Sequence, residues 1–281
     1  MSLPGNNRCA GAHGFTLLEL LVVLAIIGLL AAVTLPAMKG MRQSNALAAA
    51  NRQLLDDLAG ARQRAIKDGT VVMVVFVPPA DPANSGVFSP LMATTLWTNL
   101  LRRQLTHYAL FAERTAGDQP GRGQPRYLAH GQVWRGLPDG MFFPEWKFKN
   151  GARVPGFDPN RDVPRFDRIT GFSFPGTGGS FIQNAVVPYI AFNARGQLVQ
   201  SDNVRADGVH LASGPFKLAT EDAVIPLARG SIFEARNGSG NLMWDAPDTS
   251  EKPPGNSTAN YNLIVVDRLT GRARIESPQI Q

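Results

Sequence analysis

Residues 14–36 read GFTLLELLVVLAIIGLLAAVTLP and decide how the rest of the chain is interpreted. From Leu20 to Val33 this stretch has no polar side chain, and Glu19 is its only charged residue. About twenty residues of helix, each rising about 1.5 Å, cover the roughly 30 Å hydrocarbon core of a bilayer. The sequence therefore predicts one membrane-spanning helix over residues 15–36.

Glu19 stands where an apolar residue is expected. A carboxylate near the centre of a bilayer costs on the order of 3 kcal/mol, and less near the end of a span, so such residues usually have a partner. One interpretation is that Glu19 binds a positive charge supplied from elsewhere. The alternative is a tolerated acidic residue near a helix N-terminus, where the helix dipole favours negative charge.

The segment GFTLLE at residues 14–19 resembles the processing site of type IV prepilins and type II secretion pseudopilins. The resemblance implies a leader peptide over residues 1–14. It implies that a prepilin peptidase and methyltransferase cuts between Gly14 and Phe15 and converts Phe15 to N-methylphenylalanine. It also implies that Glu19 pairs with the Phe15 amine of a neighbouring subunit in a filament. A secretory signal peptide is the alternative, but no A-x-A cleavage site closes the apolar run.

Apolar residues continue after the predicted span at the spacing of a helix. Over residues 37–69 they recur three, four and seven positions apart, which places them on one face. They are Leu47, Leu54, Leu58, Ala61 and Ala65. This pattern predicts an amphipathic continuation of the helix that ends at Gly69 and lies on a β-sheet.

Residues 70–281 are expected to form a β-rich globular domain. Val71–Val77 is a β-branched run that predicts a buried strand. Hairpins are predicted over residues 189–199 and 263–275, with turns at Gly196 and Gly271. Further strands are predicted over residues 108–113, 132–135, 141–143 and 171–174, and a short helix over residues 96–104. Segments rich in Gly, Pro, Asn and Asp predict loops over residues 114–131, 144–168 and 236–260.

These patterns together predict an α+β fold. Its long N-terminal helix spans the membrane in its first half and packs on an antiparallel β-sheet domain in its second half, which is a pilin-like arrangement. A helix that ends with Ala61–Ile66 and is followed closely by the Val-rich strand is similar to the H-type minor pseudopilins. The resemblance therefore extends beyond the apolar segment.

No residue pattern predicts a catalytic or cofactor site. The chain has no G-x-S-x-G elbow and no P-loop. Its net charge of +6 is not gathered into an arginine-rich stripe, so nucleic acid is not an expected partner. Its single cysteine, Cys9, allows no intrachain disulfide. Asp158, Asn160 and Asp162 alternate like the start of a calcium loop, but the central glycine and the glutamate at the twelfth position are missing. A solvated acidic loop is the alternative to calcium.

The function predicted on this basis is structural, not enzymatic. The resemblance implies a minor subunit of a bacterial type II secretion pseudopilus, single-pass in the inner membrane with its C-terminal domain in the periplasm. Its implied partners are the prepilin peptidase, other pseudopilins or pilins, an assembly ATPase, a membrane platform protein and membrane lipid. The alternatives are a minor pilin of a type IV pilus and a membrane-anchored periplasmic enzyme.

Overall fold

The computed structural model describes most of the chain after the first sixteen residues. It covers residues 17–80, 100–112, 126–127, 134–149, 154–155, 162–163, 165–170, 174–175, 181–182, 186–212, 214–259 and 261–276. Side chains are not described at residues 33–44, 126–127, 154–155, 162–163, 174–175 and 181–182. The chain divides into two compact units, residues 1–45 and 46–281, and each is described by itself.

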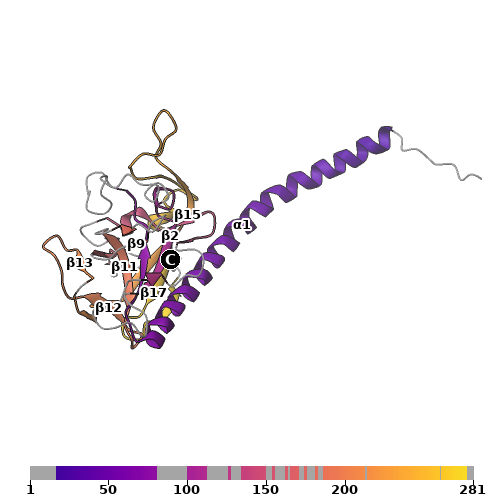
Figure 1. The fold of residues 1–281 in the computed structure, drawn as a ribbon. Coiled ribbons are helices and arrows are strands. Elements are labelled where there is room, and N and C mark those ends of the chain that lie inside the picture. Colours follow the sequence, from indigo (N-terminus) through magenta and orange to yellow (C-terminus); the bar gives the residue numbers. More distant parts are fainter. Residues whose placement is uncertain are drawn as a thin grey trace, which may run out of the picture. The chain divides into compact units, whose positions relative to one another are not determined.

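The helix α1 comprises 52 residues, Leu17–Asp68, and contributes to both units (Figure 1). It ends where the sequence predicts, because Gly69 adopts a φ of 62°, which glycine reaches without the steric cost of a Cβ. Within the described part of the chain, no helix is both long enough and apolar enough to cross a membrane. The predicted span over residues 15–36 includes Phe15, Thr16 and side chains after Ala32 that lie outside the described residues, so it stays a prediction.

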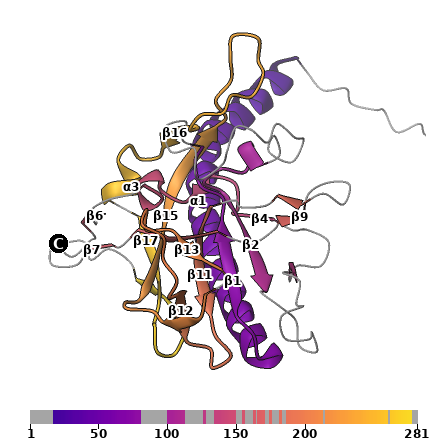
Figure 2. The same ribbon diagram turned by 60° about the vertical axis from the view of Figure 1, so that its left-hand side comes forward.

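The larger sheet of the second unit is built around β1, Val72–Phe76. It pairs antiparallel with β2, His107–Ala112, on one side and with β11, Val187–Phe192, on the other (Figure 2). Both faces of these strands are covered, which explains the continuous apolar run in the sequence. The outer strands of this sheet are β3 (Arg126–Tyr127), β4 (Arg135–Gly136), β8 (Asp167–Thr170), β12 (Leu198–Ser201), β13 (His210–Leu211) and β14 (Phe216–Leu218). The pairing of β13 with β8 is parallel.

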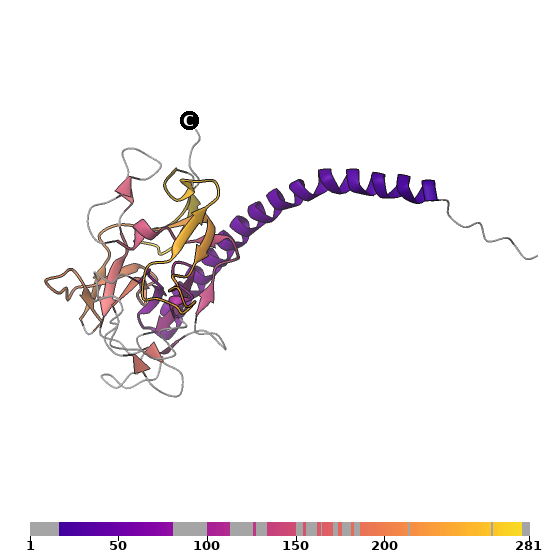
Figure 3. The same ribbon diagram turned by 90° about the horizontal axis from the view of Figure 1, so that it is seen from above.

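A second sheet is organised by β15, Ala223–Phe233. Its other strands are β5 (Met141–Phe142), β16 (Asp248–Glu251), β17 (Asn262–Val266) and β18 (Ala273–Glu276), and all their pairings are antiparallel. The yellow C-terminal strands of this sheet are visible in Figure 3. Short elements complete the described fold: η1 (Glu145–Lys147), α3 (Asn256–Ala259), β6 (Val154–Pro155) with β7 (Asp162–Val163), and β9 (Phe174–Pro175) with β10 (Phe181–Ile182).

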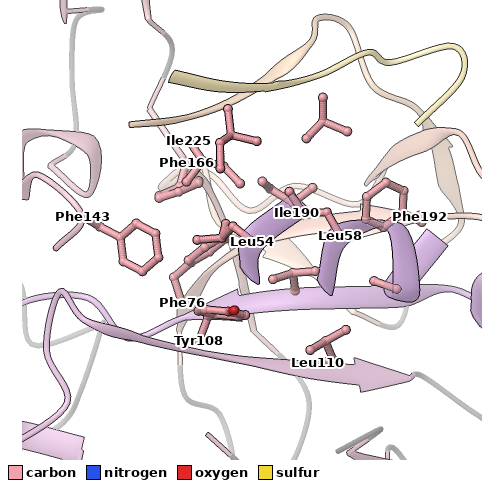
Figure 4. Close-up of a cluster of buried hydrophobic side chains, with 14 of the residues drawn as sticks. Leu54, Leu58, Phe76, Tyr108, Leu110, Phe143, Phe166, Ile190, Phe192 and Ile225 are labelled. Atoms are coloured by element: carbon pink, nitrogen blue, oxygen red, sulfur yellow. The ribbon is translucent and has the colours of Figure 1, made fainter. Parts of the chain in front are cut away.

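The second half of α1 supplies one face of the hydrophobic core. Leu54 and Leu58 are almost fully buried, and Figure 4 shows them among side chains from both sheets. Ala50, Ala61 and Ala65 complete the buried stripe. The predicted amphipathic face is confirmed, and so is the α+β fold with an N-terminal helix and antiparallel sheets.

Arg62 links α1 to two hairpin turns that are distant in sequence. Its Nε donates to the carbonyl oxygens of Gly196, at 3.2 Å, and Thr270, at 2.7 Å. These turns approach so closely that a Cβ on Gly271 would lie 1.9 Å from the Gly196 oxygen. Glycine is therefore required at position 271 both by space and by its φ of 63°. Both predicted hairpins are confirmed.

Some predictions from the sequence differ from the structure. Residues 223–233 were assigned to no element, because Pro226 and Gly230 interrupt the apolar pattern, but they form β15, the longest strand of the described residues. All three predicted loops contain short elements: β3 lies in residues 114–131, η1, β6, β7 and the start of β8 in residues 144–168, and β16 and α3 in residues 236–260. Of the strand predicted over residues 171–174, residues 171–173 lie outside the described part and Phe174 belongs to β9.

Candidate processing and assembly site

Glu19 lies in the first turn of α1, where its side chain is exposed. A carboxylate in a first turn interacts favourably with the positive end of the helix dipole. Gly14 and Phe15, the two residues predicted to flank the cut, lie outside the described residues. The geometry of the Glu19 carboxylate relative to Phe15 therefore stays a prediction.

The helix around Glu19 presents apolar side chains to its surroundings in every direction. Leu17 is 82% exposed and Leu24 is 60% exposed. The same exposure extends over Leu18, Leu20, Leu21, Val22, Val23, Ile26, Ile27, Leu29 and Leu30. A helix that is apolar on all sides is normally covered, by lipid or by other helices. Gly28 has no atom within 4 Å of where a Cβ would stand, so it offers a place where another helix can approach closely.

This arrangement suits helix assembly and offers no obvious chemistry. One carboxylate in a long apolar surface attracts a single cation, because opposite charges interact more strongly in a medium of low dielectric constant. A comparison with protein-family models identifies a prokaryotic N-terminal methylation motif at residues 9–35. The chain carries the signature of prepilins and pseudopilins. Neither the comparison with curated proteins nor the comparison with solved structures finds a match.

The methylation motif supports a type IV pilin-like or pseudopilin subunit, which is a structural role and not an enzymatic one. It implies processing by prepilin peptidase and assembly with other pilins into pilus-like filaments. It is consistent with anchoring in the inner membrane by the N-terminal segment. The motif is shared by secretion and pilus systems and does not distinguish them.

The residues of the calcium hypothesis are hardly covered by the described part of the chain. Asp158 and Asn160 of the calcium hypothesis lie outside the described part, and only the backbone of Asp162 is described, in β7. Elsewhere in the described ranges, no three His, Cys, Asp or Glu side chains are placed to hold a metal ion.

His210 shares a 2.9 Å hydrogen bond with the Tyr189 hydroxyl, which also accepts from the Ser201 backbone N–H at 3.1 Å. These bonds join β11, β12 and β13.

The sequence did not single out Lys147, which is 1% exposed. Its ammonium nitrogen lies 4.5 Å from the centre of the Phe166 ring, a cation–π geometry. Burial lowers the pKa of Lys147 to about 7, although Asp167 and Glu221 oppose this shift. The signal in the sequence is its position between two aromatic residues, Trp146 and Phe148. The surroundings fit a structural lysine that covers Phe166.

Proposed function

We propose that this chain is an H-type minor subunit of a type II secretion pseudopilus. The observation that supports the proposal is that the methylation motif at residues 9–35 includes the start of α1, a 52-residue helix whose second half packs on antiparallel sheets. In this proposal the prepilin peptidase cuts between Gly14 and Phe15 and methylates Phe15. The mature chain then begins almost at the first residue of α1.

Cleavage at this position creates a charge that complements Glu19. The new amine on Phe15 is cationic, and the apolar helix around Glu19 strengthens its attraction to a carboxylate. Leaving either charge without a partner among packed apolar helices costs several kcal/mol. In the proposal, Glu19 therefore binds the Phe15 amine of the adjacent subunit and fixes the axial register of the filament.

The proposed location follows from the same segment. The leader, residues 1–14, lies in the cytoplasm, residues 15–36 span the inner membrane, and residues 37–69 and 70–281 lie in the periplasm. A cytoplasmic ATPase and a membrane platform protein drive insertion and extraction of subunits, and membrane lipid covers the span before assembly. The alternative, a minor pilin of a type IV pilus, would have the same location and the same partners.

Intact-mass and N-terminal peptide analysis of protein purified from its native membrane tests the processing step. The expected mature chain begins at Phe15 and carries one added methyl group. Gly14→Val should leave the precursor uncut, because a β-branched residue replaces glycine at the cut, whereas Gly11→Val in the same leader should be cut normally. An uncut wild-type chain, or a cut near Ala32, would contradict the proposal.

The choice between the two filament systems requires a deletion strain. Loss of secreted proteins from the medium with surface pili intact is expected for a pseudopilin. Loss of surface pili with secretion intact would instead identify a type IV minor pilin. Restoration by the wild-type gene but not by the Gly14→Val variant would tie either phenotype to processing.

A further inference from the structure

Two exposed apolar surfaces lie at opposite ends of β15. One contains Phe233, the last residue of the strand. The other contains Leu269, in the turn that follows β17, whose Val266 pairs with Ala223, the first residue of β15. The 11 residues of β15 rise about 3.3 Å each, so about 35 Å separates the two places. Figure 2 shows the same separation, with β16, beside Phe233, near the top and β12, which bonds to Arg268, near the bottom.

The tip surface consists of Phe233, Met243 and Asp248, which are all exposed. Asp248 lies directly opposite Phe233 in the pairing of β15 with β16. The Met243 N–H donates to the Ala235 oxygen at 2.8 Å, so Met243 lies opposite the residue two positions after Phe233. Alternate residues of a strand, and residues opposite each other on paired strands, share one face. The three side chains therefore form one exposed face that is mainly apolar and includes a carboxylate.

Negative charge prevails around the tip surface. Residues 231–251 carry four acidic side chains and one basic side chain, which is a net charge of −3. Glu234 follows Phe233 in the sequence and so points to the opposite face, where it contacts Arg102 and Arg236. These two arginines therefore lie on the face away from the tip surface.

The base surface lies where the end of α1 meets two hairpin turns, and it consists of four exposed residues: Ile66, Arg195, Leu269 and Arg272. Arg62 joins these segments, since its Nε donates to the oxygens of Gly196 and Thr270. A Cβ on Gly196 would lie 2.8 Å from the Ile66 Cδ1, so Ile66 reaches the turn that carries Arg195. Apolar and cationic side chains therefore lie together at this end of the domain.

Positive charge prevails around the base surface. Residues 61–69, 193–197 and 267–272 carry six basic and two acidic side chains, which is a net charge of +4. Asp222, which accepts the Arg268 N–H at 2.9 Å, adds one negative charge and leaves these surroundings positive. The tip and base surfaces are thus complementary in charge, and both expose apolar side chains.

We propose that the tip surface of one copy of this chain docks on the base surface of the next copy. The exposed apolar side chains of the two surfaces cover each other, and Asp248 lies beside Arg195 and Arg272. Because the two surfaces differ and lie at opposite ends of β15, the contact is heterologous and leaves one tip and one base free for further copies. In a filament, packed α1 helices would hold neighbouring copies close, so a weak contact suffices.

Sedimentation equilibrium of the full-length protein in density-matched detergent tests this contact. The detergent covers the apolar first half of α1, so the globular domains are left to associate. The average mass should rise with protein concentration and continue beyond that of a dimer, because a heterologous contact stays open. A dissociation constant on the order of 0.1 mM is expected for a small surface of this kind.

Two altered proteins distinguish a head-to-tail contact from a symmetric one. Asp248→Arg changes only the tip surface, and Arg195→Asp with Arg272→Asp in one chain changes only the base surface. Each protein alone should associate at least about tenfold more weakly than the wild-type chain, since charges of like sign then meet. An equimolar mixture should form dimers with about wild-type affinity, because it supplies one unaltered tip and one unaltered base. Dimers in the mixture would also show that both proteins are folded.

The apolar part of the contact has its own variant and control. Phe233→Ala removes the largest exposed side chain of the tip surface and should weaken association by about tenfold or more. Val204→Ala is the control, since Val204 is exposed to a similar extent and belongs to neither surface. Its effect on association should stay within about threefold.

Several outcomes would overturn the proposal. A wild-type chain that stays monomeric up to about 0.5 mM would mean that a different protein covers these surfaces. Association that all variants retain would come from the first half of α1, and growth that stops at a dimer would indicate a closed, symmetric contact. A mixture that associates no better than its two components would exclude the pairing of tip with base. The experiment uses the uncut chain, so its failure leaves the proposed processing at Gly14 unaffected.

Discussion

The apolar side chains of α1 are buried in its second half and exposed in its first half. In the second half, apolar residues occupy one face and are buried, as Leu54 and Leu58 show. In the first half, large apolar side chains from Leu17 to Leu30 are exposed on all sides. One helix thus contains a segment whose partners come from its own chain and a segment whose apolar surface is left for lipid or other subunits.

The carboxylates of the two halves repeat this contrast. Asp57 accepts a 2.5 Å hydrogen bond from the Tyr108 hydroxyl and contacts Arg135, so it ties α1 to β2 and β4. Gln53 supports the same cluster by donating to the Tyr108 oxygen at 3.0 Å. Burial raises the pKa of Tyr108 to about 12, which keeps it a donor to Asp57. Glu19 occupies an exposed first turn instead.

The largest effect on stability is expected from a substitution at Leu54, in the buried half of α1. Leu54→Ala should lower the free energy of unfolding by about 2–5 kcal/mol, because it removes buried methyl groups and leaves a cavity. Leu24→Ala is the matched change in the exposed half and should stay within about 0.5 kcal/mol. All four tryptophans lie after residue 45, so tryptophan fluorescence during denaturant unfolding reports the unfolding of residues 46–281, the unit that contains Leu54. Equal decreases in the free energy of unfolding of both variants would contradict this difference between the two halves of α1.

A smaller loss is expected when Asp57 is removed. Asp57→Ala leaves the buried Tyr108 hydroxyl without an acceptor, while the half-exposed Arg135 regains water, so a loss of about 1–3 kcal/mol is expected. Asp56→Ala is the control, since Asp56 is the neighbouring carboxylate and is exposed. The same unfolding measurement applies. No difference between the two variants would show that the cluster contributes nothing net to the fold.

The sequence predicted those parts of this molecule in which a single residue pattern decides the outcome. Helical spacing from Leu54 to Ala65 gave the buried face of α1, and alternating strands around Gly196 and Gly271 gave two hairpins. The motif at residues 14–19 led to the same family signature that the comparison identifies. In each case the information lies within a few turns of helix or one hairpin.

Sequence patterns did not predict the contacts between residues that are far apart in the chain. β15 was missed because Pro226 interrupts its apolar pattern, and its pairings with β17 and β5 join segments that are distant in sequence. Asp57 looked like any polar residue of an amphipathic helix, and its role depends on Tyr108 and Arg135, 51 and 78 positions away. Lys147 was placed in a loop, yet aromatic packing buries it.

Glu19 should have the smallest effect on stability and a large effect on assembly. Glu19→Ala and Glu19→Gln should both be cut after Gly14 and unfold within about 0.5 kcal/mol of the wild-type chain, since the side chain is exposed. Both should reduce incorporation into filaments by about tenfold or more, because neither can neutralise the amine on Phe15. Quantitative immunoblotting of sheared filaments measures this loss, with Leu18→Ala as the control.

The pair of variants separates charge from shape at this position. Gln keeps the size and polarity of Glu19 and removes only its charge, so assembly by Glu19→Gln but not by Glu19→Ala would assign the role to packing or hydrogen bonding. Normal assembly of both variants would contradict the pairing of Glu19 with Phe15. Loss in both, with an unchanged free energy of unfolding, would mean that the carboxylate in the first half of α1 acts between chains, whereas Asp57 in the second half acts within one.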